Sequence, residues 1–326
     1  MTSVSIVETD AGRSLKIAPK TAVALVTGGA RGIGRAIAME LARTGMRVCI
    51  ADTGAALNGT GMDPGPAEET AKQIRDSGGA AMALSLDARD SKSAHQLVEN
   101  AGEWAGELPS VLVHSAGSLR DAMIHKASDE DWSEVMGSHL MLAVELTRQL
   151  AGAMRERRWG RIVYVGGAAG LVGSVGQAAY DVAKAGLFGL MRAVALEMAG
   201  RDICVNYLVP FAWTRMTESI PPANDTLRKY LATAGGAVPE DIAPVAAWLC
   251  SAAAKGISGQ VIYARGAEIA IWSQPRPLAR VVRKQGFDAQ SIEADVRPVL
   301  EKNLVPLESE FDLFSGPPEM ITRVAR

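Results

Sequence analysis

Several residue types and patterns that would indicate particular kinds of protein are scarce in this chain of 326 residues. Only three cysteines occur, Cys49, Cys204 and Cys250, and none belongs to a CxxC pair. We therefore expect small core residues in a reduced compartment and no metal site. No apolar run reaches the roughly 18 residues needed to span a bilayer. The formal net charge of −2 predicts no nucleic-acid partner, which would need a strongly basic surface.

The amino-terminal segment also lacks a continuous apolar core. Residues 1–19 scatter Glu8, Asp10, Arg13 and Lys16 among short apolar pieces, so we expect no secretory signal and predict a cytoplasmic location without membrane association. The whole chain is 48% hydrophobic and 21% charged. This is the composition of a soluble globular protein, long enough for one large domain with a buried core.

From residue 20 onward, short apolar segments alternate with amphipathic stretches. Ile33, Ile37 and Leu41 share one helical face, and Ser128 begins a capping-box pattern at the start of a long helix. Strands that alternate with helices of roughly 10 to 15 residues indicate a parallel sheet covered on both faces, the doubly wound (Rossmann-like) α/β fold. Strands are predicted over 22–26, 47–51, 82–86, 111–113, 161–165, 203–208 and, last, 260–264, with long helices over 129–156 and 179–198.

Two stretches lie outside this alternation. Residues 54–66 are rich in glycine and proline and predict a long loop after the second strand. Residues 266–326 contain several prolines and predict a helical extension, which we expect to cover either the functional site or a neighbouring subunit. The predicted organisation is an amino-terminal tail over 1–19, a Rossmann-fold domain over 20–265 and a carboxy-terminal extension over 266–326.

A glycine-rich turn joins the first predicted strand to the first helix. Gly28, Gly32 and Gly34 let the backbone turn tightly and approach a pyrophosphate, while the helix N-terminus offers free amides and a positive dipole end. Asp52 ends the second strand at the spacing expected for an acid that accepts the ribose hydroxyls. Its charge would repel a 2′-phosphate, so NAD is favoured over NADP, although Arg31 could attract that phosphate. The alternative for Asp52 is a plain loop or helix-capping acid.

A second motif places a phenol and an ammonium group one helical turn apart, at Tyr180 and Lys184. A nearby ammonium group favours the phenolate, so we expect Lys184 to lower the pKa of Tyr180 and prepare it for proton transfer. Such a pair by itself is a common feature of solvated helices. In the same chain as a dinucleotide-binding turn, it predicts a hydride-transfer enzyme.

Residues 20–265 resemble the short-chain dehydrogenase/reductases. The segments that carry the resemblance are Thr27–Gly34, His114–Gly117, Tyr180–Lys184 and Pro210–Thr217. Finer features are similar to the hydroxyacyl-CoA dehydrogenase domain of peroxisomal multifunctional enzyme type 2 and to its bacterial relatives, which act on steroids and on CoA thioesters of steroid side chains. These features are the loop after Asp52 and the segments 121–132, 176–180, 215–217 and 272–276.

The resemblance implies roles for individual residues. Tyr180 would be the general acid/base, and Lys184 would bind the nicotinamide ribose. His139 stands where most of the family has an asparagine that supports a proton-relay water, although a buried core histidine is an equal alternative. Around the glycine loop, which includes Ile33, further cofactor contacts are implied: Asp87 and Ala88 at the adenine, Ala116 and Gly117 at the adenosine ribose, and Thr214 at the carboxamide. For Asp87, a helix-capping role is an alternative nearly equal to the adenine contact.

One residue of the family pattern is missing. The family places a serine that holds the substrate carbonyl thirteen residues before the tyrosine, and this chain has Gly167 there. The nearest hydroxyl, Ser174, is expected on the loop toward the substrate. Losing an oxyanion-type donor costs roughly 100- to 1,000-fold in rate. The resemblance also implies two asparagines directly before Ala116-Gly117, and this chain has His114 and Ser115 there.

These observations predict an NAD-dependent oxidoreductase acting on a secondary alcohol or ketone, of the steroid or 3-hydroxyacyl-CoA type. Homodimers or homotetramers are expected through the helices over 129–156 and 179–198. Two alternatives remain: a catalytically silent subunit of a hetero-oligomer, and an enzyme of non-redox proton transfer. Met191, Trp213, Met216 and Ile220 are candidates for apolar substrate walls or, alternatively, for core residues.

Overall fold

The computed structural model describes residues 22–222, 224–314, 316 and 318–321. An eight-stranded sheet runs through the centre, in the order β3-β2-β1-β4-β5-β6-β7-β8, and every neighbouring pair is parallel except β7 with β8. This confirms the doubly wound α/β fold. The strands are β1 (Val23–Thr27), β2 (Arg47–Ala51), β3 (Ala80–Leu84), β4 (Val111–His114), β5 (Trp159–Val165), β6 (Asp202–Phe211), β7 (Val261–Arg265) and β8 (Glu268–Ile271).

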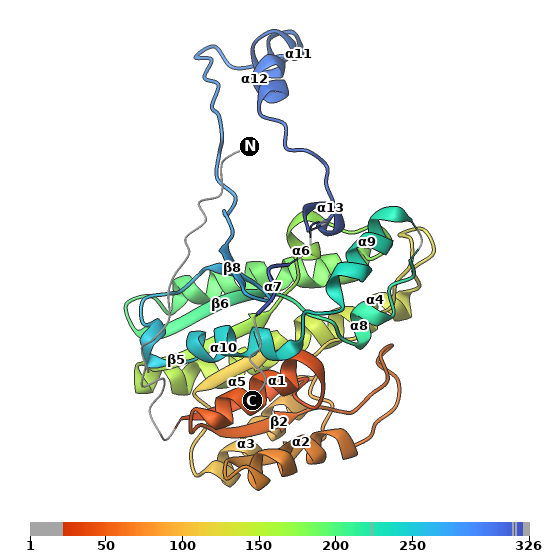
Figure 1. Cartoon of the computed structure of the whole chain (residues 1–326). Helices are drawn as coiled ribbons and strands as arrows, with labels where there is room; N and C mark the ends of the chain where they lie inside the picture. Colours follow the sequence, from red (N-terminus) through yellow and green to blue (C-terminus); the bar gives the residue numbers. More distant parts are fainter. Residues whose placement is uncertain (1–21, 223, 315, 317, 322–326) are drawn as a thin grey trace.

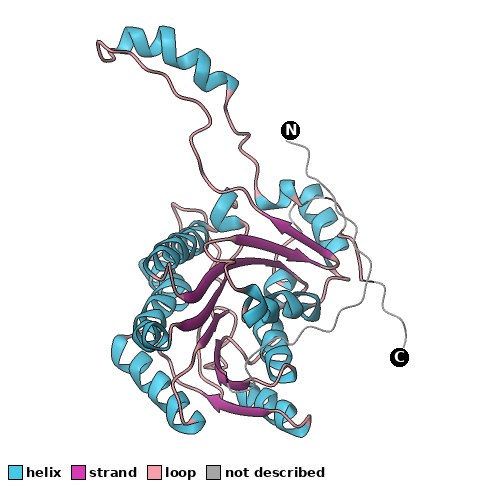
Figure 2. Ribbon diagram, turned by 90° about the vertical axis from the view of Figure 1, so that its left-hand side faces the viewer, coloured by secondary structure: helices cyan, strands magenta, loops and turns pink. Residues whose placement is uncertain are grey.

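Helices cover both faces of the sheet (Figure 2). On one face, α1, α2 and α10 enclose a core that includes Ile37, Leu41 and Ile74. On the other face, α3, α5 and α7 bury Leu97, Leu146 and other apolar side chains. The helices of this body are α1 (Gly32–Arg43), α2 (Gly65–Asp76), α3 (Ser91–Ala105), α4 (Asp129–Met136), α5 (Leu142–Arg157), α6 (Ala169–Val172), α7 (Ala178–Glu197), α8 (Arg215–Glu218), α9 (Asp225–Ala234) and α10 (Pro239–Leu249).

Local sequence explains where several of these helices begin and end. Asp90 caps α3, accepting hydrogen bonds from two backbone amides, and Gly106 ends the helix in the left-handed region with φ of 73°. The predicted capping box of Ser128 is present at the start of α4. A π-helical turn, η1 (Gly137–Met141), joins α4 to α5, so the predicted helix over 129–156 is continuous but changes its winding around His139.

The predicted strands all exist, but the prediction that 260–264 is the last strand was wrong. β8 follows β7 as an antiparallel hairpin partner, with Ala264 opposite Ile269. Its alternating burial differs from the continuously buried parallel strands, and its four residues are too few for a clear period-2 pattern. The division of the chain at residue 265 remains a prediction, and the predicted tail over 1–19 lies outside the described residues.

Beyond β8, the chain leaves the body and returns. Figures 1 and 2, which differ by a quarter turn, both show the segment between Gln274 and Ser309 standing away from the sheet. The arm carries α11 (Ala289–Ser291), η3 (Ile292–Val296) and α12 (Arg297–Lys302), and the short helix α13 (Glu310–Leu313) lies back on the body. The short 3-10 helix η2 (Ala252–Ala254) precedes β7. Among the described residues, no helix is long and apolar enough to cross a membrane.

Parallel strands place their carboxyl ends at one edge of the sheet, and the chain order reverses between β1 and β4. This switch point is where open α/β sheets bind ligands. A cavity of about 550 Å³ lies there. The residues that follow β1, β2, β4, β5 and β6 all contribute to its wall, so five separate segments meet at one place.

Candidate cofactor and active site

The glycine loop has the tight geometry that its sequence predicts. Gly28 has φ of 64°, and a Cβ atom there would lie 2.7 Å from the Ala116 nitrogen and from the Ser115 carbonyl oxygen. At Gly34, a Cβ atom would lie 2.1 Å from the Gly28 oxygen. A side chain at Gly28 would therefore collide with the segment after β4, and a side chain at Gly34 would collide with the start of the glycine loop. Gly28, Arg31, Gly32, Ile33 and Gly34 all line the cavity.

The N-terminus of α1 opens into this cavity without a side-chain cap among the described residues, because the N-cap is Arg31 and its guanidinium reaches elsewhere. No acidic residue lies in the first turn of the helix. The backbone amides and the positive dipole end are therefore available to an anion. This arrangement fits the pyrophosphate of a dinucleotide.

Asp52 is held at the mouth of the cavity by two backbone amides. Its Oδ2 atom accepts a hydrogen bond of 2.9 Å from the Ala30 nitrogen, and its Oδ1 atom one of 2.8 Å from the Gly54 nitrogen. The carboxylate thus joins the glycine loop to the end of β2, at the position predicted for the ribose. Arg31 donates to the carbonyl oxygens of Gly54 and Ala55, at 3.3 and 3.2 Å.

A second arginine at this mouth was not predicted as a cofactor residue. Arg215, the first residue of α8, lines the cavity, and its pKa is lowered by burial and by the charge of Arg31, while Asp52 opposes the shift. These three charged groups come from three different segments of the chain. They lie 21 to 184 residues apart in the sequence, so only the fold reveals that they share one corner of the cavity.

Asp87, which is predicted to contact the adenine, is not a helix cap, since Asp90 caps α3. Arg89 binds the Asp87 carboxylate through its Nε atom at 2.9 Å and donates to Glu134 at 2.5 Å. Asp87, Ala88, Arg89 and Glu134 all line the cavity, and the adenine contacts of the first two stay a prediction. The sequence analysis did not single out Arg89 or Glu134, because their ion pair joins the loop after β3 to α4 across 45 residues.

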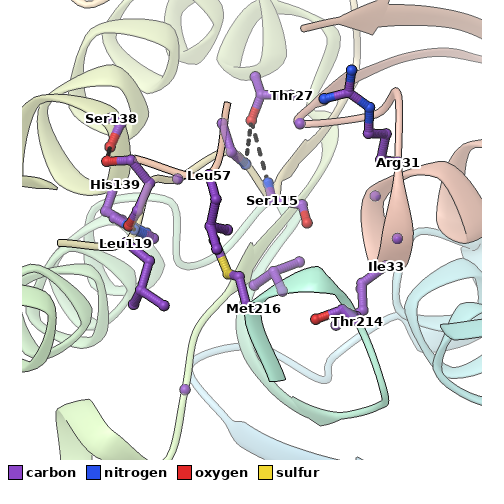
Figure 3. A pocket seen from close by; sticks show the side chains of 18 of the residues that line it. Thr27, Arg31, Ile33, Leu57, Ser115, Leu119, Ser138, His139, Thr214 and Met216 are labelled. Carbon is purple, nitrogen blue, oxygen red and sulfur yellow. Dashed lines mark hydrogen bonds between the residues drawn. The ribbon is translucent and has the colours of Figure 1, made fainter. Parts of the chain in front are cut away.

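The predicted residues after β4 also line the cavity. The hydroxyl of Thr27 accepts from the Ser115 and Ala116 nitrogens, at 3.2 and 3.3 Å, and so joins the ends of β1 and β4 (Figure 3). Gly117 leaves room for the imidazole ring of His139, because a Cβ atom at position 117 would lie 1.9 Å from the His139 Cε1 atom. Thr214 caps α8 and points its methyl group toward Gly32.

Tyr180 and Lys184 lie side by side on α7, with the Lys184 Nζ atom 5.3 Å from the centre of the Tyr180 ring. Lys184 donates a hydrogen bond of 2.9 Å to the Val165 carbonyl, and burial lowers its pKa to about 7. The pKa of Tyr180, however, is raised well above 10, chiefly by burial and then by the charge of Glu310. Burial and the charge of Glu310 therefore outweigh the lowering expected from Lys184, whose own charged form is disfavoured by burial.

His139 is buried and meets the Tyr180 ring edge-on, with 5.1 Å between ring centres. Its Nε2 atom lies 2.8 Å from the Ser118 carbonyl oxygen, which requires the proton on that nitrogen. Burial and Lys184 hold the pKa of His139 well below 6.5, so the ring is neutral. His114 donates in turn to the His139 carbonyl at 2.7 Å. Both histidines are ordered by hydrogen bonds, and His139 lines the cavity.

Gly167 faces the phenol, as the family spacing implies. A Cβ atom at Gly167 would lie 3.1 Å from the Tyr180 hydroxyl oxygen. Tyr207, which the sequence analysis did not single out, holds this turn in place. Its hydroxyl accepts a hydrogen bond from the Gly167 nitrogen at 3.0 Å and can donate to the carbonyl oxygen of Gly167 at 3.1 Å or to that of Lys184 at 3.2 Å. Ser174 is not a replacement, because its Oγ atom is directed to Glu310 at 3.4 Å and it does not line the cavity.

The comparisons with known proteins agree with this geometry. The sequence model of the short chain dehydrogenase family matches residues 22–225, which include the glycine loop and the Tyr180–Lys184 pair. The chain belongs to this family. It is a short-chain dehydrogenase/reductase, from a family of oxidoreductases that use a nicotinamide dinucleotide.

Individual relatives support the same assignment. A short-chain type dehydrogenase/reductase of Mycobacterium tuberculosis is 38% identical over 229 residues, 70% of this chain and 77% of that protein. Peroxisomal multifunctional enzyme type 2 of Mus musculus is 36% identical over 228 residues, 70% of this chain but only 29% of the mouse protein. The crystal structure of a short chain dehydrogenase from Mycobacterium avium superposes with a TM-score of 0.75 and 32% identity, over 89% of this chain and 98% of that one.

In this dehydrogenase, the cavity continues past Tyr180 into an apolar region. Met216 and Ile220 line it, as expected of substrate walls, and in Figure 3 the Met216 side chain reaches toward Leu57. Trp213 does not line the cavity and packs against the core, and Met191 is fully buried. The far wall was not predicted at the level of residues: it consists of Phe211, Tyr230, Tyr263, Glu310 and Phe314. Two of these five residues, Glu310 and Phe314, belong to the carboxy-terminal extension, and whether the extension as a whole covers the site or a neighbouring subunit stays a prediction.

Proposed function

We propose that the protein is an NAD-dependent oxidoreductase that transfers a hydride between nicotinamide and a secondary alcohol or ketone. The observation that carries the proposal is the meeting of two motifs in one cavity. The uncapped N-terminus of α1 with Asp52 forms one end, and the Tyr180–Lys184 pair forms the other. The family and its cofactor class are established by the comparisons; the remainder is our inference.

Asp52 supports NAD over NADP. A 2′-phosphate would bring negative charge to a carboxylate whose two oxygens are already oriented by backbone amides. Arg31 is the residue that could compensate, but it donates to two loop carbonyls instead. Arg215 retains a positive charge nearby, so the preference rests on the balance between one fixed carboxylate and one exposed guanidinium.

The bound cofactor would supply or accept the hydride at its nicotinamide ring. Tyr180 would exchange the proton at the substrate oxygen, and Lys184 would orient the ribose while holding the Val165 carbonyl. Because the pKa of Tyr180 is raised in the structure, its hydroxyl keeps the proton at neutral pH. This is the form that protonates a ketone during reduction. His139, neutral and packed against Tyr180, would steady the phenol ring and serve as the proposed relay residue.

The substrate is proposed to be a steroid or a 3-hydroxyacyl-CoA thioester. Support comes from the apolar and aromatic wall beyond Tyr180 and from the similarity to the mouse multifunctional enzyme. A homodimer or homotetramer is proposed through the continuous helix α4–η1–α5, where Met141 is exposed, and through α7, where Val182 and Leu196 are exposed. The predicted cytoplasmic location remains a prediction.

A silent subunit of a hetero-oligomer is the second candidate, and Gly167 is the observation that favours it. The three described atoms nearest to a Cβ atom at position 167 all belong to Tyr180, the closest being its hydroxyl oxygen at 3.1 Å, so none of them is a serine or threonine hydroxyl. Intact Tyr180 and Lys184 argue against it. Non-redox proton transfer by the same pair is the third candidate.

The test measures NADH production with 17β-hydroxysteroids and 3-hydroxyacyl-CoA thioesters, and NADH consumption with the matching ketones. Wild type is compared with Tyr180→Phe and Gly167→Ser, with and without a co-expressed homologue. Turnover that Tyr180→Phe abolishes supports the dehydrogenase. Activity that appears only with a partner subunit supports the silent subunit, and substrate change without any absorbance change at 340 nm supports non-redox chemistry.

A further inference from the structure

The carboxy-terminal segment returns to the active site and is fixed there by aromatic packing. The chain contains only five phenylalanines and five tyrosines, and half of these ten gather at this place. Phe311 meets Tyr230 edge-on at 4.9 Å between ring centres, and Phe314 stacks on Tyr263 at 4.6 Å. Aromatic pairs in edge-on and stacked geometries attract each other beyond the effect of their buried area. The cluster therefore positions α13, which begins at Glu310.

Glu310 is the one residue of α13 whose side chain lines the cavity, within the described part of the chain. Its Oε2 atom accepts a hydrogen bond of 3.1 Å from the Ala169 nitrogen, and its Oε1 atom accepts one of 3.4 Å from Ser174 Oγ. Its own backbone nitrogen donates to the Gly173 carbonyl. The carboxyl group is thus fastened to the segment that begins at Gly167, the segment from which other family members present a hydroxyl to the substrate.

Several titratable groups face this carboxyl group. Burial raises the pKa of Glu310 most strongly, and the charges of Asp181 on α7 and of Asp121 add to this effect, while the Ala169 and Ser174 hydrogen bonds oppose it. Together they raise the pKa of Glu310 to about 7. The carboxyl group in turn raises the pKa of the surrounding phenols, which are Tyr180, Tyr207, Tyr230 and Tyr263. Near neutral pH, a large share of Glu310 side chains therefore carries a proton and can donate a hydrogen bond.

We propose that the carboxyl group of Glu310 donates to the substrate oxygen the hydrogen bond that the hydroxyl of a residue at position 167 donates elsewhere in the family. The proposal rests on the proposed function. Glu310 binds and polarises the oxygen and transfers no proton; the proton still comes from Tyr180. A carboxylic acid in an apolar site can act in this way, as an established case in another enzyme shows.

The arrangement accounts for two departures from the family pattern at once. Gly167 presents no hydroxyl beside that of Tyr180, and a segment outside the family match reaches the same cavity with a different donor. It also accounts for Ser174, whose hydroxyl is used to hold Glu310. In this proposal, the carboxyl group of Glu310 takes the place of the hydroxyl that is missing at position 167.

The test compares Glu310→Ala and Glu310→Gln in wild-type and Gly167→Ser backgrounds, with ketone reduction followed at saturating NADH. We expect Glu310→Ala to lower kcat by about 100-fold, the size of a lost oxyanion donor. Glu310→Gln retains an amide donor and should lose no more than about tenfold. Gly167→Ser should restore the activity of Glu310→Ala at least tenfold and change wild type little. Glu308→Gln, at an exposed position on the same segment, is the matched control.

The pH profile separates this role from a merely structural one. If the protonated carboxyl group is the donor, kcat/KM for reduction falls as pH rises through about 7, and this fall is absent in Glu310→Gln. Lys184 and Asp181 also titrate in this region, with pKa values of about 7 and 6. The decisive comparison is therefore whether the fall of kcat/KM above pH 7 is lost in Glu310→Gln. Glu310→Ala within threefold of wild type would overturn the proposal. So would a loss that neither Gly167→Ser nor glutamine repairs.

A second measurement does not depend on turnover. Carbon-13 NMR of protein labelled at the glutamate carboxyl carbons should show one signal that titrates near pH 7 and is missing in Glu310→Gln. A titration near the ordinary value of about 4.3 would overturn the proposal, because no proton would remain to donate. NADH binding without ketone turnover in wild type, together with activation by Gly167→Ser, also contradicts it. Failure to bind NADH or NADPH would instead contradict the proposed function.

Discussion

Replacement of Asp52 by asparagine tests the cofactor preference most directly. The variant keeps the size of the side chain and removes its charge. Unit charges about 4 Å apart interact by about 4 kcal/mol at an effective dielectric constant of 20, and salt reduces this value. The carboxylate should therefore disfavour a 2′-phosphate by about 2–4 kcal/mol, or roughly 30- to 900-fold in Kd. We expect Asp52→Asn to remove most of this preference.

The variant also has a cost to the loop. The Asp52 carboxylate accepts from the Ala30 and Gly54 nitrogens, and an asparagine amide can accept only one of these hydrogen bonds. Leaving one amide without its partner should lower the free energy of unfolding by about 1–3 kcal/mol. NADH affinity should fall modestly, while NADPH affinity should rise, since Arg31 and Arg215 would then dominate the local charge.

The assay is fluorescence titration of wild type and variant with NADH and NADPH at fixed ionic strength. Asp87→Asn is the matched control, because this acid lines the same cavity but is paired with Arg89. We expect the control to leave the ratio of the two Kd values unchanged. Equal or tighter NADPH binding by wild type would refute the argument, as would an unchanged ratio in Asp52→Asn.

Three further predictions concern the active site and the core. Lys184→Met should reduce turnover by about 100- to 10,000-fold without lowering Tm, because the buried ammonium is already disfavoured; a lower Tm would contradict this reasoning. Arg161→Met should lower the free energy of unfolding by about 3–5 kcal/mol in denaturant titrations, since the Ser251, Gly160 and Asp202 carbonyls lose a fully buried donor. The same change at exposed Arg276, which donates to the neighbouring Pro275 carbonyl, should cost little. The raised pKa of Glu310 stabilises the fold below about pH 4.3, and this contribution disappears as pH rises through about 7. Glu310→Gln should therefore gain Tm relative to wild type between pH 5 and 8, and parallel Tm curves would contradict the assignment.

The motifs of the glycine loop and of Tyr180–Lys184 could be recognised in the sequence because each is local. A turn that needs glycine at Gly28 and a helix that spaces two side chains by one turn leave their mark within a few residues. The alternation of apolar strands with amphipathic helices likewise predicts the parallel sheet and therefore the edge at which both motifs meet. Family membership followed from these residues.

The remaining features depend on contacts between distant segments. Arg215 joins Asp52 at the cofactor mouth, and Tyr207 supports Gly167, although neither pair is close in the sequence. The expectation for the Tyr180 pKa was wrong for the same reason. A spacing of four residues shows that Lys184 is near, but burial and the charge of Glu310 decide the direction of the shift, and both are properties of the folded chain.

The sequence alone therefore determined the fold class, the family and the identity of the phenol and ammonium pair, since each is encoded in local backbone and helix geometry. It also showed that the family serine is replaced by Gly167. Only the tertiary structure brought Glu310, 143 residues further along, into the same cavity. The extension has no periodic pattern that points back to the sheet, and it is the aromatic contacts of Phe311 and Phe314 that bring its end to the active site.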